Sequence, residues 1–384
     1  MGKELRYSKP AMSKSRLDDK EDFLGVERTF QAVMAEIYAG AAERDARPSF
    51  PEEPFRHLAR SAVLAMPVPD PVGEVGLGSS FAEEWRVLRA VARADGSVGR
   101  ILDGHFNGVE RLSLLAPEPL RSAELEAVAA GELRLGVWGA DPIPGEGDPA
   151  RLVDGKEGPT LSGVKTFCSG STGLDRALVL VRGDTLGPPL LAYVDLSSGV
   201  KVDTAWFRGA GMRASESHRV VFDGAPVLAV LGEPGELVRE PYFSRDAIRT
   251  AVTWAGIADT AVGAALDVMA AKVGGTEPDD LVSLAAGRML TAQGTIDRWL
   301  AYAAQLADEN PDALPGVSTQ LRQAVAVSCR EILDEAARAV GSHPFAVSGP
   351  LDRARRDLEL FLLQHRLEPA LMRRGRRSIT ERGS

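Results

Sequence analysis

The spacing of hydrophobic residues changes twice along this chain of 384 residues, and this limits the folds that it can adopt. From about Glu21 to Val128 apolar residues recur at steps of three and four, which indicates helices. From about Leu133 to Leu231 short β-branched or alternating runs are separated by Gly, Pro, Asp and Ser, which indicates strands. Helical spacing then returns and predicts four long helices, near Pro241–Lys272, Asp279–Ala307, Val317–Val340 and Pro350–Met372.

This order predicts three folded domains of mixed class. After a flexible N-terminus at residues 1–20, we expect an N-terminal α-helical domain at 21–130 and a central β-barrel at 131–236. A C-terminal four-helix bundle is expected at 237–384. The strands expected in the barrel are Leu133–Trp138, Gly163–Phe167, Ala177–Val181, Leu190–Val194 and His218–Phe222.

Composition excludes several classes of function. The hydrophobic share of 44% and charged share of 26% are typical of a folded, soluble protein. A formal net charge of -9 argues against a nucleic-acid partner, because phosphate binding needs a concentrated basic surface. No long apolar run or apolar leader is found, so we expect no membrane partner and a cytoplasmic location. Cys168 and Cys329 lie far apart, and neither a disulfide framework nor a metal site is expected.

Four segments in this order carry a family resemblance. Leu135–Pro142 reads LGVWGADP, and Leu161–Ser171 reads LSGVKTFCSGS. Trp206–Val227 reads WFRGAGMRASESHRVVFDGAPV, and a last segment runs from Pro350 through an Arg-Asp pair to His365. Together they resemble motifs of the acyl-CoA dehydrogenase superfamily over nearly the whole chain. The resemblance implies a helical, barrel and bundle arrangement, a bound flavin, and a homodimer or homotetramer built from the bundle.

The second segment has a physical interpretation of its own. In a regular strand Phe167 and Ser169 point to one face and Cys168 to the other. Phe167 can then supply an apolar wall for a flavin ring, and the hydroxyl or amide of Ser169 can reach its N5 edge. The resemblance implies the same roles. An ordinary strand that ends in a turn remains the alternative.

The resemblance implies further cofactor contacts. It places Trp138, Gly139 and Ala140 under the ring and Cys168 at an aliphatic position of the flavin-facing strand. Ala140 replaces a residue that usually carries a hydroxyl, so that hydrogen bond must come from backbone amides or be missing.

FAD is the expected cofactor and FMN the alternative. The family's Arg-x-x-Phe-Gly segment, which holds the adenine half, is not found between Lys272 and Arg288. The pyrophosphate loop reads Arg-Ala-Val-Gly-Ser from Arg338, where the family has Gln-x-x-Gly-Gly. Arg338 is therefore predicted to contact a cofactor phosphate, with a solvated helix-end residue as the alternative.

The usual catalytic Glu is absent. Its position in the last helix matches His365, which is predicted to be catalytic and to share a helix face with Leu358, Phe361 and Leu362. A second lineage of the family places the Glu in the first bundle helix, but Ile248–Ala251 holds no carboxylate, and Asp246 and Asp259 only flank it.

The first long helices contribute the other candidate site residues. His105 and Asn107 are predicted to bind substrate. For His105 and His365 the alternative is a core histidine bonded to a backbone carbonyl.

Three functions follow, from different classes. The first is a flavin-dependent oxidoreductase that acts on an acyl thioester, carried on CoA or a carrier protein. The second is a monooxygenase that takes reduced flavin from a separate reductase and uses His365 and His105 around the activated oxygen. The third is a non-catalytic protein that keeps the fold.

Overall fold

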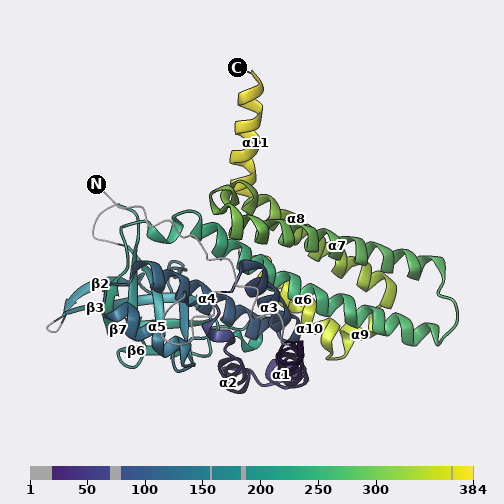
Figure 1. Ribbon diagram of the computed structural model, residues 1–384, viewed down its shortest axis with the longest axis horizontal. Helices are drawn as coiled ribbons and strands as arrows, with labels where there is room; N and C mark the ends of the chain where they lie inside the picture. The colour runs from purple at the N-terminus through teal and green to yellow at the C-terminus, as the bar shows by residue number, and fades with distance from the viewer. Residues whose placement is uncertain (1–19, 70–78, 156–157, 183–186, 365, 384) are drawn as a thin grey trace.

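The N-terminal part of the molecule is helical, as predicted. The computed structural model describes residues 20–69, 79–155, 158–182, 187–364 and 366–383 (Figure 1). The predicted flexible N-terminus lies almost entirely outside these residues. Asp95 separates the two central helices of this part, and its carboxylate accepts hydrogen bonds from the amides of Ser97 and Val98. The helices are α1 Lys20–Ala46, α2 Glu52–Arg60, α3 Phe81–Ala94, α4 Gly96–Leu115 and α5 Leu120–Ala129, with a 3-10 turn at Val63–Ala65.

The middle of the chain forms one curled sheet, which corresponds to the predicted barrel. Its strands follow the order β1-β4-β5-β7-β3-β2, and β6 pairs with β7. The pair β1 and β4 is parallel and the other pairs are antiparallel. The strands are β1 Leu135–Trp138, β2 Arg151–Gly155, β3 Gly158–Cys168, β4 Arg176–Val181, β5 Leu190–Asp195, β6 Val200–Asp203 and β7 His218–Val230. Strands β2 and β6 escaped the sequence prediction because they are short, have no fully buried residue and carry polar side chains.

The C-terminal part contains three long helices and a shorter fourth. They are α6 Tyr242–Val273, α7 Asp280–Glu309, α8 Leu314–Val340 and α10 Pro350–Phe361, with α9 His343–Ala346 as a single turn. The prediction of one final helix from Pro350 to Met372 was wrong. Helix α10 ends at Phe361, and a separate helix, α11 Glu368–Gly383, stands away from the body (Figure 1). Pro369 explains the break, because its ring would clash with the preceding helical turn.

A continuous hydrophobic core joins the three parts. It contains Leu88 from α3, Leu102 from α4, Val179 from β4 and Ile332 from α8, and it extends through α6. Helix α6 is long and apolar enough to cross a membrane by length and composition alone, but half of that window is buried inside the protein. The observed architecture of helices, curled sheet and helical bundle confirms the predicted fold class. The exact domain boundaries stay predictions.

Candidate flavin site and its surroundings

The end of β3 turns Phe167 outward. Phe167 adopts a left-handed backbone conformation with a φ of 53°, and the pairing of β3 with β7 shifts register between Lys165 and Cys168. Its ring is 54% exposed and meets the ring of Trp206 edge-on, with 4.9 Å between the centroids. This bend corrects the predicted alternation: Cys168 and Ser169 are both buried, and only Phe167 presents an apolar face to solvent.

The predicted contact residues at the end of β1 lie beside this bend. The indole of Trp138 is buried, and its Nε1 donates to the carbonyl of Ser169 at 3.0 Å. Gly139 and Ala140 are exposed, and the carbonyl of Ala140 accepts from the Thr166 amide at 3.1 Å. The ends of β1 and β3 therefore form one exposed surface, made of Gly139, Ala140 and Phe167, which we call the ledge. Trp138 lies beneath it and joins the two strands through its hydrogen bond to Ser169.

A salt bridge holds this ledge together. Lys165, although 1% exposed, places its Nζ 2.7 Å from Asp141 Oδ1 and 3.3 Å from the carbonyl of Gly139. Burial is the main influence on this ammonium group and lowers its pKa, and Asp141 opposes that shift. Sequence reasoning named Lys165 only as part of a motif. The structure gives it a positioning role for the turn that contains Gly139 and Ala140.

Ser169 is committed to a buried hydroxyl cluster. Its Oγ lies 2.9 Å from Ser217 Oγ, which lies 2.7 Å from Ser215 Oγ, and its amide donates to the carbonyl of Phe167. Cys168 is fully buried, and burial raises the pKa of its thiol far above the ordinary value. Contact of Cys168 or Ser169 with a cofactor stays a prediction.

The loop that follows β6 docks the sheet onto α10. The amide of Met212 donates to Asp357 Oδ1, and Gly211 lies directly against the backbone of Arg356. The same loop carries Trp206, which packs on Phe167. The ledge is thus placed next to the helix that leads toward His365.

Asp357 makes this junction sensitive to pH. Burial, with the nearby carboxylates of Asp95 and Asp45, raises the pKa of Asp357 to about 7. The pKa of Asp357 is higher in the folded than in the unfolded state. The contribution of this protonated carboxyl to the unfolding free energy is therefore fully present at low pH and is lost as pH rises through about 7. We expect Asp357→Asn to reduce this loss, which at most reaches about 4 kcal/mol.

Urea unfolding at about pH 5 and about pH 8 measures the effect of Asp357→Asn. The variant should gain stability relative to wild type as pH rises. Asp154→Asn, at an exposed carboxylate of β2, should follow the wild-type pH dependence. Identical pH dependence for Asp357→Asn and wild type would contradict the assignment.

The two predicted substrate-binding residues lie inside the protein. His105 is fully buried, its Nε2 lies 2.9 Å from the carbonyl of Leu64, and its Nδ1 accepts from the amide of Leu135 at 3.1 Å. Burial lowers the pKa of His105 to about 4, so the ring is neutral near pH 7. Asn107 bridges Asp103 and Arg249. Both side chains have the contacts of core residues, and their substrate role stays a prediction.

The predicted catalytic residue, His365, lies outside the described residues. The helix expected to carry it ends at Phe361. Leu358 and Phe361 are both buried in the core. The catalytic role of His365 therefore stays a prediction.

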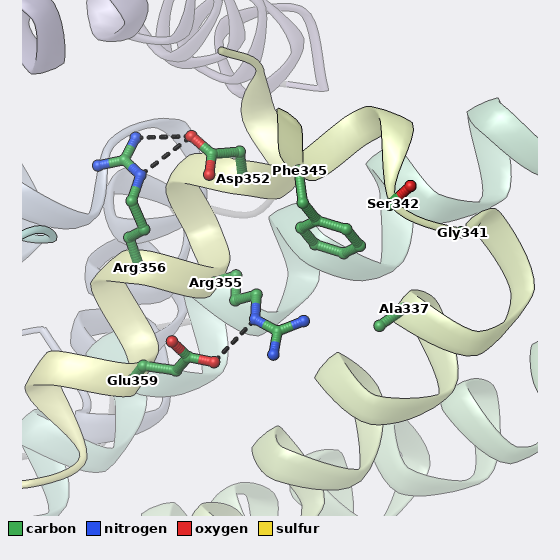
Figure 2. A pocket seen from close by; sticks show the side chains of 8 residues that line it. All are labelled: Ala337, Gly341, Ser342, Phe345, Asp352, Arg355, Arg356 and Glu359. Carbon is green, nitrogen blue, oxygen red and sulfur yellow. Dashed lines mark hydrogen bonds and ion pairs between the residues drawn. The ribbon is translucent and has the colours of Figure 1, made fainter. Parts of the chain in front are cut away.

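A pocket of about 490 Å³ lies between α8, α9 and α10 (Figure 2), and Arg338 follows its lining residue Ala337 near the C-terminal end of α8. Arg338 is 67% exposed and pairs with Glu335 at 2.7 Å. In Figure 2, the Phe345 ring and the Arg355 guanidinium face the same space, with Arg355 lying 5.1 Å from the ring centroid. The pocket is lined by Ala337, Gly341, Ser342, Phe345, Asp352, Arg355, Arg356 and Glu359.

The two carboxylates that flank the alternative base position on α6 are held by arginines. Asp259 accepts from Arg89 at 2.7 and 2.9 Å and from Gln293 at 2.7 Å. Asp246 Oδ2 accepts from Arg111 at 2.6 Å, and burial raises the pKa of Asp246 to about 7. Within the described residues no group of three His, Cys, Asp or Glu side chains forms a metal site.

The architecture is an N-terminal helical domain, a curled sheet and a helical bundle, with α10 contacting the loop that follows β6. A family model described as the acyl-CoA dehydrogenase N-terminal domain matches residues 21–132. This match and the arrangement of the domains support membership of the acyl-CoA dehydrogenase superfamily.

Curated relatives are similar over half of their length. The chain is 32% identical over 206 residues to the amino sugar nitrososynthase RubN8 of Streptomyces rubradiris, covering 51% of this chain and 48% of that protein. It is 28% identical over 215 residues to a dibenzothiophene monooxygenase of Rhodococcus erythropolis, and this alignment covers 53% of this chain and 48% of that protein. The alignments therefore span about half the length of these relatives.

Solved structures are similar over most of the chain. A nitrososynthase from Micromonospora carbonacea var. africana has a TM-score of 0.75 and 26% identity, covering 88% of this chain and 91% of its own. FMN-bound TdsC from Paenibacillus sp. A11-2 has a TM-score of 0.79 and 21% identity, and the match covers 90% of this chain and 95% of TdsC. At that identity the likeness to TdsC establishes the fold alone.

Proposed function

We propose that the protein is a flavin-dependent monooxygenase that uses reduced FMN from a separate reductase. One observation carries this choice over an acyl-thioester dehydrogenase: the stretch that matches the alternative base position, Ile248–Ala251, contains no carboxylate, and Asp259 beyond it is bound to Arg89 and Gln293. Abstraction of an α-proton requires a free base at that place. Insertion of oxygen does not, because reduced flavin supplies two electrons, one oxygen atom enters the substrate and the other leaves as water.

The named relatives support the same choice. They include a dibenzothiophene monooxygenase, amino sugar nitrososynthases and a probable FMNH2-dependent monooxygenase of Pseudomonas putida. None of these names describes an acyl thioester as substrate. A small, non-CoA molecule is therefore the substrate class that we propose.

The ledge at the ends of β1 and β3 fits a flavin ring. Phe167, braced by Trp206, offers a flat apolar surface, and the exposed backbone of Gly139 and Ala140 offers polar groups beside it. The surrounding chain holds this surface in place through Lys165 and Asp141. These residues would bind and orient the ring.

FMN suits the bundle better than FAD. The segment that holds an adenine half in this family is missing from the sequence, while the pocket beside Arg338 offers cationic groups for a phosphate. We propose that Arg338, Ser342 and Arg355 hold the FMN phosphate of a neighbouring subunit in a homodimer or homotetramer. Glu335 and Glu359 pair with these arginines in the free chain and would be displaced.

Removal of the Phe167 ring should weaken flavin binding. We expect Phe167→Ala to reduce FMN affinity by about fivefold, since one aromatic contact is worth roughly 1 kcal/mol. The unfolding free energy should change little, because the ring is half exposed. Fluorescence titration of FMN measures the affinity, with Val153→Ala on β2 as a matched surface control. Equal FMN affinity in Phe167→Ala and wild type would remove Phe167 from the site.

Reductase dependence tests the function itself. The protein, FMN and a flavin reductase with NADH are incubated in air with dibenzothiophene, indole or an amino sugar nucleotide. We expect product only when the reductase is present. Anaerobic bleaching of a bound flavin by an acyl-CoA, without reductase, would support the dehydrogenase instead.

A further inference from the structure

Arg322 is a buried cation with two guanidinium nitrogens that have no partner among the described residues. It lies on α8, its side chain is 9% exposed, and its Nε and Nη2 atoms have no hydrogen-bond partner among the described residues. Nε and Nη2 form one side edge of the guanidinium, which binds a carboxylate through two parallel hydrogen bonds. An unpaired buried charge is costly, so a vacant edge of this kind indicates a missing anion.

The nearest opposite charge does not fill this role. Burial lowers the pKa of Arg322 to about 10, and Asp103 on α4 is the carboxylate that opposes this shift. Both Asp103 oxygens are already bonded, Oδ2 to Arg100 at 2.9 Å and Oδ1 to Asn107 at 2.9 Å. Arg322 is therefore influenced by Asp103 without being bonded to it.

The surroundings favour a small organic anion. The guanidinium of Arg322 lies 5.7 Å from the Trp254 ring, and Trp254 Nε1 is another buried donor without a partner in the described part of the chain. Trp254 meets Phe361 edge-on at 6.1 Å, and Arg100 lies over the other ring at 5.7 Å. Three unpaired donor atoms next to two aromatic rings suit an acceptor group attached to an apolar body.

The local charge selects a monoanion. Arg100 and Arg322 bring two positive charges, and Asp103 brings one negative charge when ionised. A carboxylate balances the remaining positive charge, whereas a phosphate dianion would face Asp103 with an excess of negative charge.

We propose that Arg322 binds the carboxylate of a small organic acid in the interior between α4, α6, α8 and α10. This goes beyond the proposed function, because binding needs neither flavin nor oxygen. Phe361, which packs against Trp254, is the last residue of α10. The acid would then be a substrate, a product or an effector of the enzyme.

Thermal shift and calorimetry with sodium benzoate test the proposal. Benzamide serves as the neutral analogue and sodium chloride as the ionic-strength control. We expect benzoate to stabilise the wild-type protein, and to bind about 10- to 100-fold more weakly to Arg322→Met, the loss typical of charged hydrogen bonds. Arg330→Met, on the exposed face of the same helix, should bind benzoate as wild type does.

Stability gives a second readout that a purely structural arginine would not show. Without anion, Arg322→Met should be at least as stable as wild type, because it removes an uncompensated buried charge. Arg322→Lys keeps the charge without the side edge and should fold but bind benzoate weakly. Equal benzoate binding in wild type and Arg322→Met, no response of wild type to benzoate, or stronger binding of inorganic phosphate would each overturn the carboxylate site.

Discussion

Replacing Arg249 with Met should destabilise the protein by about 3–5 kcal/mol, because it removes the ion pair of the buried Glu84 and one of the two arginines bonded to Glu110. Arg249 lies on α6 and is 1% exposed. It bonds Glu84 of α3 at 2.7 Å and Glu110 of α4 at 2.7 Å. Its loss removes the ion pairs that join three helices, which urea unfolding at neutral pH would detect.

Two control variants isolate this effect. Arg47→Met breaks an ion pair with Glu43 in which both side chains are largely exposed, and should change stability by less than about 1 kcal/mol. The double variant Arg249→Met with Glu84→Leu should recover part of the loss, since no unpaired carboxylate of Glu84 then remains. A single Arg249→Met variant as stable as Arg47→Met would show that the buried network contributes nothing.

Gly211→Ala should be the second severe substitution, with a loss of about 3 kcal/mol from overpacking. A Cβ at this position would lie 2.0 Å from the carbonyl oxygen of Arg356 and 2.5 Å from the amide nitrogen of Asp357. Backbone atoms of α10 cannot give way as a flexible side chain can. The loop with Met212 and Trp206 must therefore move away from α10.

This displacement should also affect the cofactor. Trp206 braces Phe167, so we expect weaker FMN binding together with the lower unfolding free energy. Gly263→Ala on α6 is the matched control, because its new Cβ meets nothing within 4 Å. It should be neutral or slightly stabilising, as Ala favours the helix. Equal stability of the Gly211→Ala and Gly263→Ala variants would contradict the close packing of the loop on α10.

The fold could be predicted because hydrophobic spacing decides it. The long helices α6, α7 and α8 carry apolar residues at helical intervals, and the central strands β4 and β5 are almost wholly buried. Strands β2 and β6 carry few buried residues, so their pattern is that of loops. The break after Phe361 did have a signal, Pro369, which the apparent periodicity outweighed.

The site was harder to predict for a different reason. Phe167 was found from its motif. Strand alternation, however, wrongly placed Ser169 on the same face as Phe167, because the left-handed backbone of Phe167 breaks the alternation of side chains after it. The contact between Phe167 and Trp206 and the burial of the Arg322 guanidinium depend on tertiary packing. No local pattern distinguishes Arg322 from Arg330 on the same helix, although one is buried and the other exposed.

The same fold can thus carry different chemistry through a few positions. The ledge of Phe167, Gly139 and Ala140 is suited to a flavin whatever the reaction is. What separates the reactions is a base at the position where the family carries its Glu, and here the matching stretch of α6, Ile248–Ala251, contains no carboxylate. A flavin surface without a free carboxylate at that place is the central structural argument for oxygen insertion.

Isotope labelling tests this most directly. The protein is supplied with FMN, a flavin reductase and NADH under ¹⁸O₂, and products from dibenzothiophene, indole and an amino sugar nucleotide are analysed by mass spectrometry. The account predicts a product that carries oxygen from ¹⁸O₂ and does not form without the reductase. Product that carries only solvent oxygen, or an acyl-CoA desaturated anaerobically while flavin is bleached, would contradict it.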